Sequence, residues 1–304
     1  MNKWVVVIIV LAVLGFFSMI FAGIAALLAS APVESGNAAV IPIKGIIMAD
    51  ESYSSFGNIV ASSTKVIENI DKADNNPNVK AIIFDINSPG GSAVASDEIA
   101  ARISKLNKTT VAVIREEGAS GAYWIASATD YIIANRMSIT GSVGVIGSYL
   151  DISGFLDRYN ITYQRLVAGS EKDIGSPLKN LTAEERGIMQ EKLDKIHQIF
   201  IDEVAQNRLL TDEEIDEIST GVFFLGIEAL DLGLVDELGD IDSAKQYLAN
   251  TLNITISAFG YTEKKSFIDL LAEAFSQQSF FVGKGIGSAV FDRTGIINKI
   301  DIQT

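Results

Sequence analysis

The stretch VKAIIFDINSPGGSAVASDEIAARISKLNKTTVAVIREEGASGAYWIASA, residues 79–128, decides the fold class of this chain. Its runs 79–87 and 111–116 are almost continuously apolar and β-branched, which is typical of parallel strands that are buried on both faces. Between them, apolar residues of the segment 92–107 recur at helical spacing. A strand, a helix and a second strand within about 30 residues predict a right-handed βαβ unit of an α/β domain.

Further elements are expected on the C-terminal side of this stretch. A threonine precedes a glutamate by three positions at Thr182 and at Thr211, which is the spacing of a capping box and predicts two helix starts. The first of these helices is amphipathic and is expected to end near Arg208. Its apolar face carries Leu193, Ile196, Phe200 and Val204. Short strands are expected at residues 131–135, 142–151 and 162–169.

Composition sets broad limits on what the chain does. It has 304 residues, of which 48% are hydrophobic and 20% charged, so there is enough apolar material for a sizeable core. The formal net charge of −14 disfavours a nucleic-acid partner, which would need clustered lysine and arginine. The sequence contains neither a P-loop nor an H-E-x-x-H motif, and we expect no cofactor and no metal.

The N-terminal run of residues 4–29 contains no charged side chain. A helix of this length can cross a bilayer, and Lys3 on its N-terminal side predicts a cytoplasmic N-terminus. A cleaved signal peptide is the alternative, because residues 29–31 resemble an A-x-A cleavage site. The length of the run favours a retained single-pass anchor in the cell membrane, with the following domain on the extracytoplasmic side.

Two glycine-rich turns stand where a buried strand is followed by a helix, at residues 87–92 and 118–122. The free N–H groups and the positive dipole end of a helix N-terminus can stabilise developing negative charge. Two such turns side by side would each offer one N–H to a common oxyanion. Either turn alone is also explained as a tight strand–helix connection, but Ser120 in the second turn favours a hydrolytic site.

Ser120 needs a base to become a nucleophile. The single histidine, His197, falls within the long helix, where a packed or surface histidine is the simpler interpretation. A serine–lysine pair needs no histidine, provided that desolvation lowers the ordinarily high pKa of a lysine and leaves a neutral amine to accept the proton. The residues alone do not distinguish Lys172, in the polar segment 169–177, from a solvated lysine.

Five segments of the chain, taken together and in this order, resemble the signal peptide peptidase A family in its short, single-domain form. The resemblance covers about residues 39–250 and implies a ClpP/crotonase-like fold with repeated ββα units and a Ser–Lys dyad. The segments are DINSPGG (85–91), EGASGAYWIASA (117–128), TGSVGVIG (140–147), EKDIGSP (171–177) and VFFLGIEALDLGLVDELG (222–239).

The resemblance also implies the roles of particular residues. Ser120 matches the nucleophile, and Lys172 matches the general base. Ser142 matches a serine that orients the lysine amine, and the backbone N–H groups of Gly91 and Gly121 match the oxyanion donors. The sequence does not depart from the family pattern at any of these positions.

The expected organisation follows from the resemblance and the N-terminal run. A chain with one SPGG unit is expected to form a ring-like homo-oligomer in which a neighbouring subunit supplies the lysine, although the sequence leaves open pairing within one chain. Expected substrates are cleaved signal peptides and other apolar peptides. The expected parts are a membrane anchor (1–30), a polar tether (31–39), the peptidase domain (40–250) and a C-terminal extension in contact with another subunit or near the membrane (251–304), which includes the amphipathic stretch 266–281.

Three other interpretations fit parts of the sequence. A crotonase-type acyl-CoA hydratase or isomerase would share the fold and the backbone donors, but it usually works through acidic side chains, and an exported domain has no supply of coenzyme A. An α/β-hydrolase would need G-x-S-x-G, whose last position is Ala122 here, and a histidine late in the chain. An inactive membrane scaffold on the same fold is disfavoured, because every residue of the family's chemistry is present.

Overall fold

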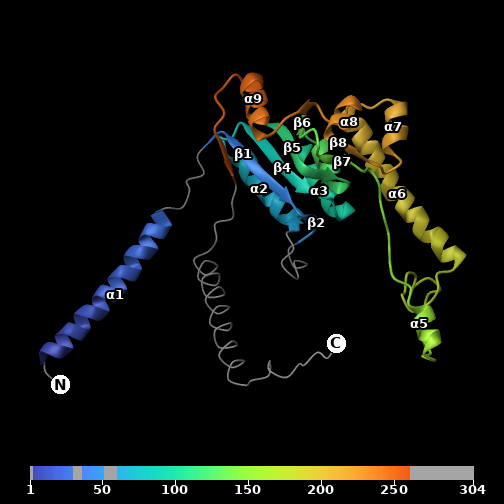
Figure 1. Cartoon of the computed structure of the whole chain (residues 1–304), viewed down its shortest axis with the longest axis horizontal. Helices are drawn as coiled ribbons and strands as arrows, with labels where there is room; N and C mark the ends of the chain where they lie inside the picture. The colour runs from blue at the N-terminus through green and yellow to red at the C-terminus, as the bar shows by residue number, and fades with distance from the viewer. Residues whose placement is uncertain (1–2, 30–35, 51–59, 261–304) are drawn as a thin grey trace, which may run out of the picture. The chain divides into compact units, whose positions relative to one another are not determined.

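The computed structural model describes residues 3–29, 36–50 and 60–260 (Figure 1). Lys3–Ala29 forms one continuous helix, α1, of 27 residues. Within α1, side chains are described for residues 3–7, 9 and 11–18. Among the described residues, no helix combines the length and the apolar composition that a membrane span requires.

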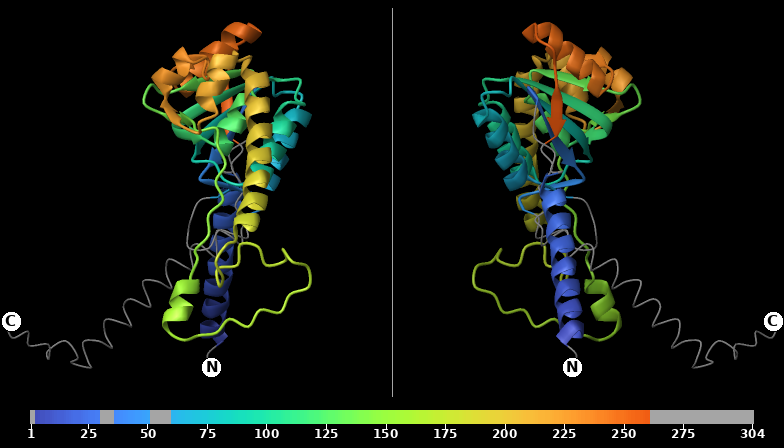
Figure 2. Two further views of the ribbon diagram at one scale, coloured as in Figure 1. Left: turned by 90° about the vertical axis from the view of Figure 1, so that its right-hand side faces the viewer. Right: turned by 90° about the vertical axis from the view of Figure 1, so that its left-hand side faces the viewer.

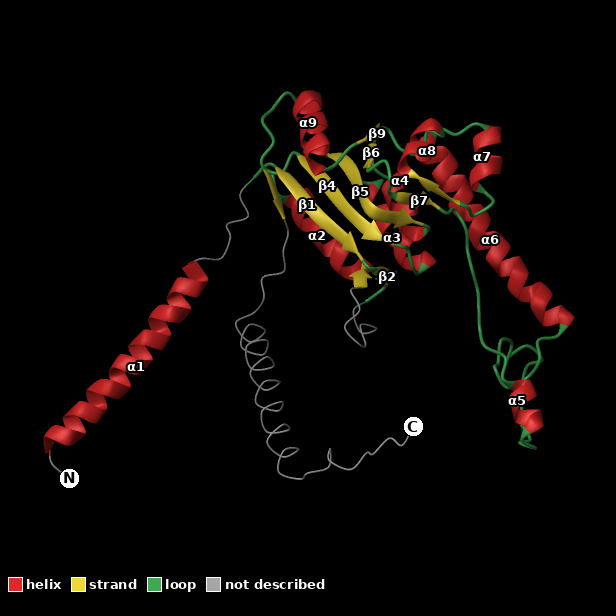
Figure 3. Cartoon of the chain, in the orientation of Figure 1, coloured by secondary structure: helices red, strands yellow, loops and turns green. Residues whose placement is uncertain are grey.

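The described residues after α1 form one compact unit around a parallel sheet (Figure 3). The main row of this sheet consists of β1 (Ala38–Lys44), β4 (Ala81–Ser88), β5 (Thr109–Ala119), β6 (Tyr131–Ala134), β9 (Glu237–Leu238) and β10 (Ala258–Gly260). Their order is β10-β1-β4-β5-β6-β9, and each neighbouring pair in this row is parallel. The prediction of an α/β fold with parallel strands is therefore confirmed.

Helices cover both faces of this sheet. α2 (Ser63–Asn75), α3 (Ala93–Ile103), α4 (Gly121–Ser127) and α6 (Ala183–Arg208) contribute to a core that includes Ile82 and Phe84 of β4. α9 (Ile241–Leu252) packs on the opposite face, where Ile83 belongs to a second core. Successive strand residues point to opposite faces, so covering both faces requires the continuously apolar strand sequences.

Both capping boxes expected from the sequence are present. At the start of α6, the Thr182 hydroxyl accepts the Glu185 N–H, and the Glu185 carboxylate accepts the Thr182 N–H. Thr211 caps the next helix, α7 (Asp212–Ile218), in the same way. The predicted end of the long helix at Arg208 is also confirmed. The remaining helices of the described residues are α5 (Ser153–Arg158) and α8 (Gly226–Asp231).

Short strands border the two glycine turns. β5 pairs through its last residues with β7 (Ile139–Gly141), and β7 pairs antiparallel with β8 (Phe223–Leu225). A separate parallel pair, β2 (Ile46–Met48) and β3 (Val60–Ser62), lies beside the first turn, where Ile47 forms a bridge to Gly91. Strands of three residues carry almost no periodic pattern, and the sequence did not predict them.

The prediction of strands at residues 142–151 and 162–169 is wrong for the single chain. Neither segment contains a strand, and Ile146 and Leu166 are 92% and 99% exposed. A strand needs a neighbour for its N–H and C=O groups, and no strand of the described residues pairs with either segment. The second segment and most of the first belong to residues 144–182, here called the arm, which includes α5. Figures 1 and 2 show α5 and the adjoining segments beyond the N-terminal end of α6, away from the sheet.

The sheet extends past both boundaries expected for the central domain. β1 begins at Ala38, and β10 ends at Gly260 after pairing with β1. Residues 258–260 therefore belong to the sheet and not to an extension. The amphipathic stretch 266–281 lies outside the described residues.

Candidate active site

The turn after β4 carries the first glycine pair of the site. Gly90 has a φ of +95°, and its N–H donates to the Ser88 hydroxyl at 3.1 Å. The Ile47 N–H donates to the Gly90 carbonyl at 2.9 Å, and the Ser92 N–H donates to the Ile47 carbonyl at 2.8 Å. The Gly91 N–H takes part in none of these three bonds. It is therefore placed to serve an incoming acceptor just before α3 begins.

The turn between β5 and α4 carries Ser120, with φ 52° and ψ −128°. Ser120 is the N-cap of α4, yet its hydroxyl makes no capping hydrogen bond, so the oxygen is not used by the helix. The backbone is held instead, because its N–H donates to the Gly141 carbonyl at 2.9 Å and its carbonyl accepts the Trp124 N–H at 3.0 Å. Backbone strain of this kind costs about 1–3 kcal/mol and is concentrated at functional sites.

The two turns lie against each other. A Cβ added to Gly90 would lie 2.8 Å from the Gly121 nitrogen and 2.9 Å from the Ser120 Cβ. A Cβ added to Gly121 would lie 2.2 Å from the Ser96 hydroxyl and 3.6 Å from the Gly91 nitrogen. The first N–H groups of a helix have no partner within the helix, so the Gly121 N–H remains available. Gly91, Ser120 and Gly121 are thus close enough to hold the oxyanion of an attacked carbonyl.

Ser142 is the second serine with a positive φ, at 51°. Its hydroxyl donates to the Gly221 carbonyl at 3.2 Å and keeps lone pairs that could accept a hydrogen bond from an amine. The other non-glycine residues with positive φ in the described part of the chain have ordinary explanations. Asn160 is a residue type that tolerates this region, and Leu209 and Asn253 are helix C-caps.

Ser120 and Ser142 line one cavity of about 750 Å³. Trp124 of α4 stacks on Phe200 of α6, with ring centroids 4.6 Å apart, and its indole N–H donates to Glu203 at 2.6 Å. The larger apolar side chains of the lining are those of Trp124, Val145, Ile146, Leu193, Ile196 and Phe200. The apolar face of α6 that the sequence predicted therefore has two roles. Its C-terminal part, with Val204, is buried in the core, and its N-terminal part, with Leu193 and Ile196, lines the cavity.

His197 also lines this cavity, a position that the sequence did not predict. Its Nε2 lies 2.9 Å from the Val143 carbonyl, so Nε2 carries the proton and donates. A nitrogen engaged in this way cannot at the same time accept the Ser120 proton. Its position one residue after Ile196 was the only sequence signal that could have placed it in this wall.

Lys172 lies in the arm, where its side chain is exposed and is not part of the cavity lining. Within one chain, the structure does not bring the predicted base and the predicted nucleophile into a common cavity. The catalytic roles assigned to Lys172, Ser142, Gly91 and Gly121 stay predictions.

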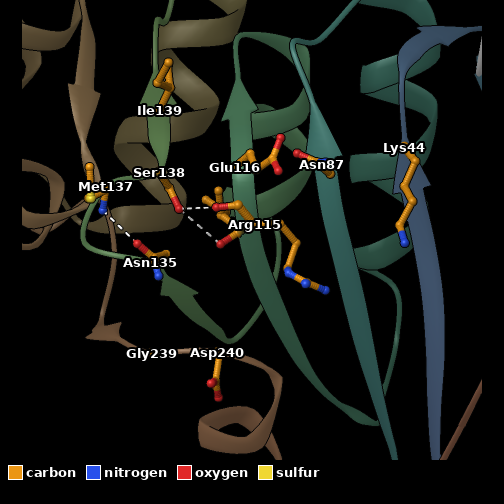
Figure 4. Close-up of a pocket in the computed structure, with 11 residues that line it drawn as sticks. Lys44, Asn87, Arg115, Glu116, Asn135, Met137, Ser138, Ile139, Gly239 and Asp240 are labelled. Carbon is orange, nitrogen blue, oxygen red and sulfur yellow. Dashed lines mark hydrogen bonds between the residues drawn. The ribbon is translucent and has the colours of Figure 1, made fainter.

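A second cavity, of about 490 Å³, lies where several parallel strands end, beside the N-terminus of α9 (Figure 4). Lys44 and Arg115 line it and form ion pairs with Asp85 of β4 at 2.9 and 3.2 Å. The Asp85 carboxylate is only 10% exposed and neutralises part of this charge. None of the residues predicted for catalysis lines this cavity, so we assign the chemistry to the cavity at Ser120.

Comparison with known proteins finds similarity to peptidases. The pattern of peptidase family S49 matches residues 102–255. A candidate protease of Methanocaldococcus jannaschii is 32% identical over 238 residues, which cover 77% of this chain and 75% of that protein. A candidate signal peptide peptidase A of Enterococcus faecium is 28% identical over 71% of this chain and 63% of its own length. Protease 4 of Salmonella typhi is 35% identical over 69% of this chain, but only 34% of that protein is covered.

Proposed function

Because this chain belongs to peptidase family S49 and is a serine-type peptidase of the signal peptide peptidase A kind, we propose that it degrades cleaved signal peptides and other apolar peptides. The observation that carries this proposal is the Ser120 hydroxyl, which lines an apolar cavity and stands between two glycine turns. The apolar lining suits apolar side chains on both sides of the cleaved bond. The parallel-rich sheet supports the finer assignment of a ClpP/crotonase-like fold with repeated ββα units.

The proposed mechanism uses Ser120 and Lys172 as a dyad. The neutral Lys172 amine takes the Ser120 proton as Oγ attacks the peptide carbonyl carbon, and the carbonyl oxygen becomes an oxyanion between the N–H groups of Gly91 and Gly121. The protonated lysine then gives its proton to the leaving amine, and the C–N bond breaks. Water, deprotonated by the same lysine, attacks the acyl-enzyme carbonyl, and the bond between that carbon and Ser120 Oγ breaks. The second product leaves as the lysine returns the proton to Oγ. Ser142 orients the amine by accepting one of its hydrogen bonds.

The lysine is proposed to come from a neighbouring subunit of a ring-like homo-oligomer. Two observations support this: Lys172 is exposed in the single chain, and the arm that carries it exposes the apolar side chains of Ile146, Leu150 and Leu166. Exposed apolar groups of this size commonly mark a contact with another protein surface.

Mixed oligomers test where the dyad forms. Ser120→Ala and Lys172→Ala chains should each be inactive alone, whereas co-expression should restore roughly a quarter of the wild-type activity, because each site then needs one particular chain at each of two positions. Mixed oligomers without activity would show that the two residues do not pair between chains.

Residues 4–29 are proposed to anchor the peptidase in the cell membrane, with the N-terminus in the cytoplasm and the catalytic domain outside it. The absence of charge from this run and the position of Lys3 support the assignment. Membrane fractions should retain the full chain after carbonate extraction, and protease added to intact spheroplasts should digest the catalytic domain. Release by carbonate would contradict the anchor.

Two substitutions test the peptidase chemistry directly. Ser120→Ala should abolish both peptide hydrolysis and labelling by a serine-reactive fluorophosphonate, with oligomer size unchanged. Lys172→Ala should abolish hydrolysis to the same extent, because nothing else in the proposed site accepts the proton. Full activity of the Lys172→Ala protein would remove the proposed base.

A further inference from the structure

The segment that carries Lys172 has almost no backbone framework of its own. Successive turns hold it: the Lys172 N–H donates to the Gly169 carbonyl at 3.1 Å, and the Ser176 N–H donates to the Asp173 carbonyl at 3.0 Å. No helix or strand of the described residues includes positions 159–182. The conformation of this segment therefore depends on side-chain contacts.

The guanidinium of Arg165 forms hydrogen bonds with this segment on both sides of Lys172. Arg165 donates through Nε to one carboxylate oxygen of Asp173 at 2.6 Å and through Nη2 to the other at 2.8 Å. The same Nη2 donates to the Ser170 carbonyl at 3.0 Å. We call Arg165, Ser170 and Asp173 the clasp. A planar guanidinium makes this bidentate contact, and a lysine ammonium cannot reproduce it.

The clasp is tied in turn to the helix that lines the Ser120 cavity. Lys179 contacts the Asp173 carboxylate at 3.5 Å and also forms an ion pair with Glu185. Glu185 closes the capping box of α6 with Thr182, and its side chain is only 5% exposed. A continuous series of charged contacts therefore runs from the flank of Lys172 to the first turn of α6.

The charge state of Asp173 favours its contacts with Arg165 and Lys179. Hydrogen bonds from Arg165 lower the pKa of Asp173 to about 2, with a further contribution from the charge of Lys179. The carboxylate therefore stays ionised, and the contact with Arg165 stays intact, at every pH at which a peptidase of this kind would work.

We propose that Arg165 and Asp173 are positioning residues that hold Lys172 in the geometry needed for proton transfer. The inference rests on the proposed function, in which Lys172 is the base. It assigns the clasp a role in turnover and not in substrate binding, because none of its residues lines the cavity. A small displacement of a catalytic group is enough to cost about 10²-fold in rate.

The test compares Arg165→Gln with Arg158→Gln in the full chain. Arg158 lies in the last turn of α5, in the same arm but outside the clasp, so the second variant makes the same charge change. Arg165→Gln should lower kcat by about 10–100-fold with KM within about threefold, whereas Arg158→Gln should match the wild type. Melting temperature and oligomer size should be unchanged in both.

Two further variants identify the contact itself. Asp173→Asn should lower kcat as Arg165→Gln does, and the double variant should lose no more than either single variant, because both remove one interaction. Arg165→Lys, which keeps the charge but loses the bidentate contact, should also lower kcat.

Wild-type kcat in both Arg165→Gln and Asp173→Asn, while Lys172→Ala is inactive, would overturn the clasp and leave the proposed function standing. An active Lys172→Ala protein would instead remove the base itself and the clasp with it. Should Arg165→Gln fail to fold, the kcat and KM of Asp173→Asn decide the question in the same way.

Discussion

Replacing Gly90 by alanine is expected to disable the active site in a protein that still folds. The φ of Gly90 is +95°, where a side chain costs about 1–2 kcal/mol. The added Cβ would also lie 2.8 Å from the Gly121 nitrogen, 2.9 Å from the Ala119 carbonyl oxygen and 2.9 Å from the Ser120 Cβ. Two of these atoms belong to the backbone and the third is fixed to it, so the two glycine turns must move apart.

The expected losses of kcat and of unfolding free energy follow from the displacement of the Gly121 N–H and from the crowding around the added Cβ. Displacing the Gly121 N–H would remove one of the two proposed oxyanion donors, a loss that typically lowers kcat by about 10²–10³-fold. Overpacking of a tight site adds about 1–3 kcal/mol to the backbone cost. The free energy of unfolding should therefore fall by about 2–5 kcal/mol, which leaves a domain of ordinary stability folded.

Gly233→Ala is the matched control, because Gly233 also has a positive φ, of +68°, but apart from its chain neighbours no atom lies within 4 Å of its added Cβ. In Gly233→Ala, the free energy of unfolding should fall only by the cost of a side chain at positive φ, and the activity should be kept. The assay is kcat/KM for an apolar fluorogenic peptide, combined with urea unfolding of both variants. If Gly90→Ala hydrolyses the peptide as fast as Gly233→Ala does, the contact between the two turns does not contribute to catalysis.

Three other substitutions probe neighbouring contacts. Ser142→Ala should lower kcat by about tenfold or more, because the mechanism proposed above uses its hydroxyl to orient the Lys172 amine; an unchanged kcat would leave Ser142 without a catalytic role. His197→Ala should destabilise the fold by about 1 kcal/mol through its lost hydrogen bond and still hydrolyse peptides, and loss of all activity would point to a histidine base. Tyr123→Phe should cost about 1–3 kcal/mol, because the buried Leu234 carbonyl loses its donor at 2.7 Å. Burial raises the pKa of Tyr123, so its contribution is complete below about pH 10 and is lost as the pH rises from there; melting curves of the variant should lack that alkaline fall.

Local sequence patterns predicted those parts of the fold whose causes are local. The runs that became β4 and β5 are apolar on both faces because both faces are covered, and this requirement is visible in any short window of sequence. The capping boxes at Thr182 and Thr211 were predicted for the same reason, since each involves residues only three positions apart. The three-residue strands β7 and β8 have no such pattern, because partners distant in the sequence define them.

Two predicted strands do not form in the single chain. Residues 142–151 and 162–169 have strand-like composition, but a strand forms only where another strand lies beside it. Among the described residues of the single chain, no strand lies beside these segments, and the side chains of Ile146, Leu150 and Leu166 remain exposed.

The residue types of the site and the turns that carry them were determined by the sequence alone: a serine, a single histidine, no cysteine, and two glycine-rich strand–helix turns. Only the tertiary structure decided that the turns touch, because their contact depends on β4 and β5 being neighbours in the sheet. It also decided that α6 closes the cavity and that Lys172 stands outside it in one chain. Adjacency of this kind arises from long-range packing, which no short window of sequence encodes.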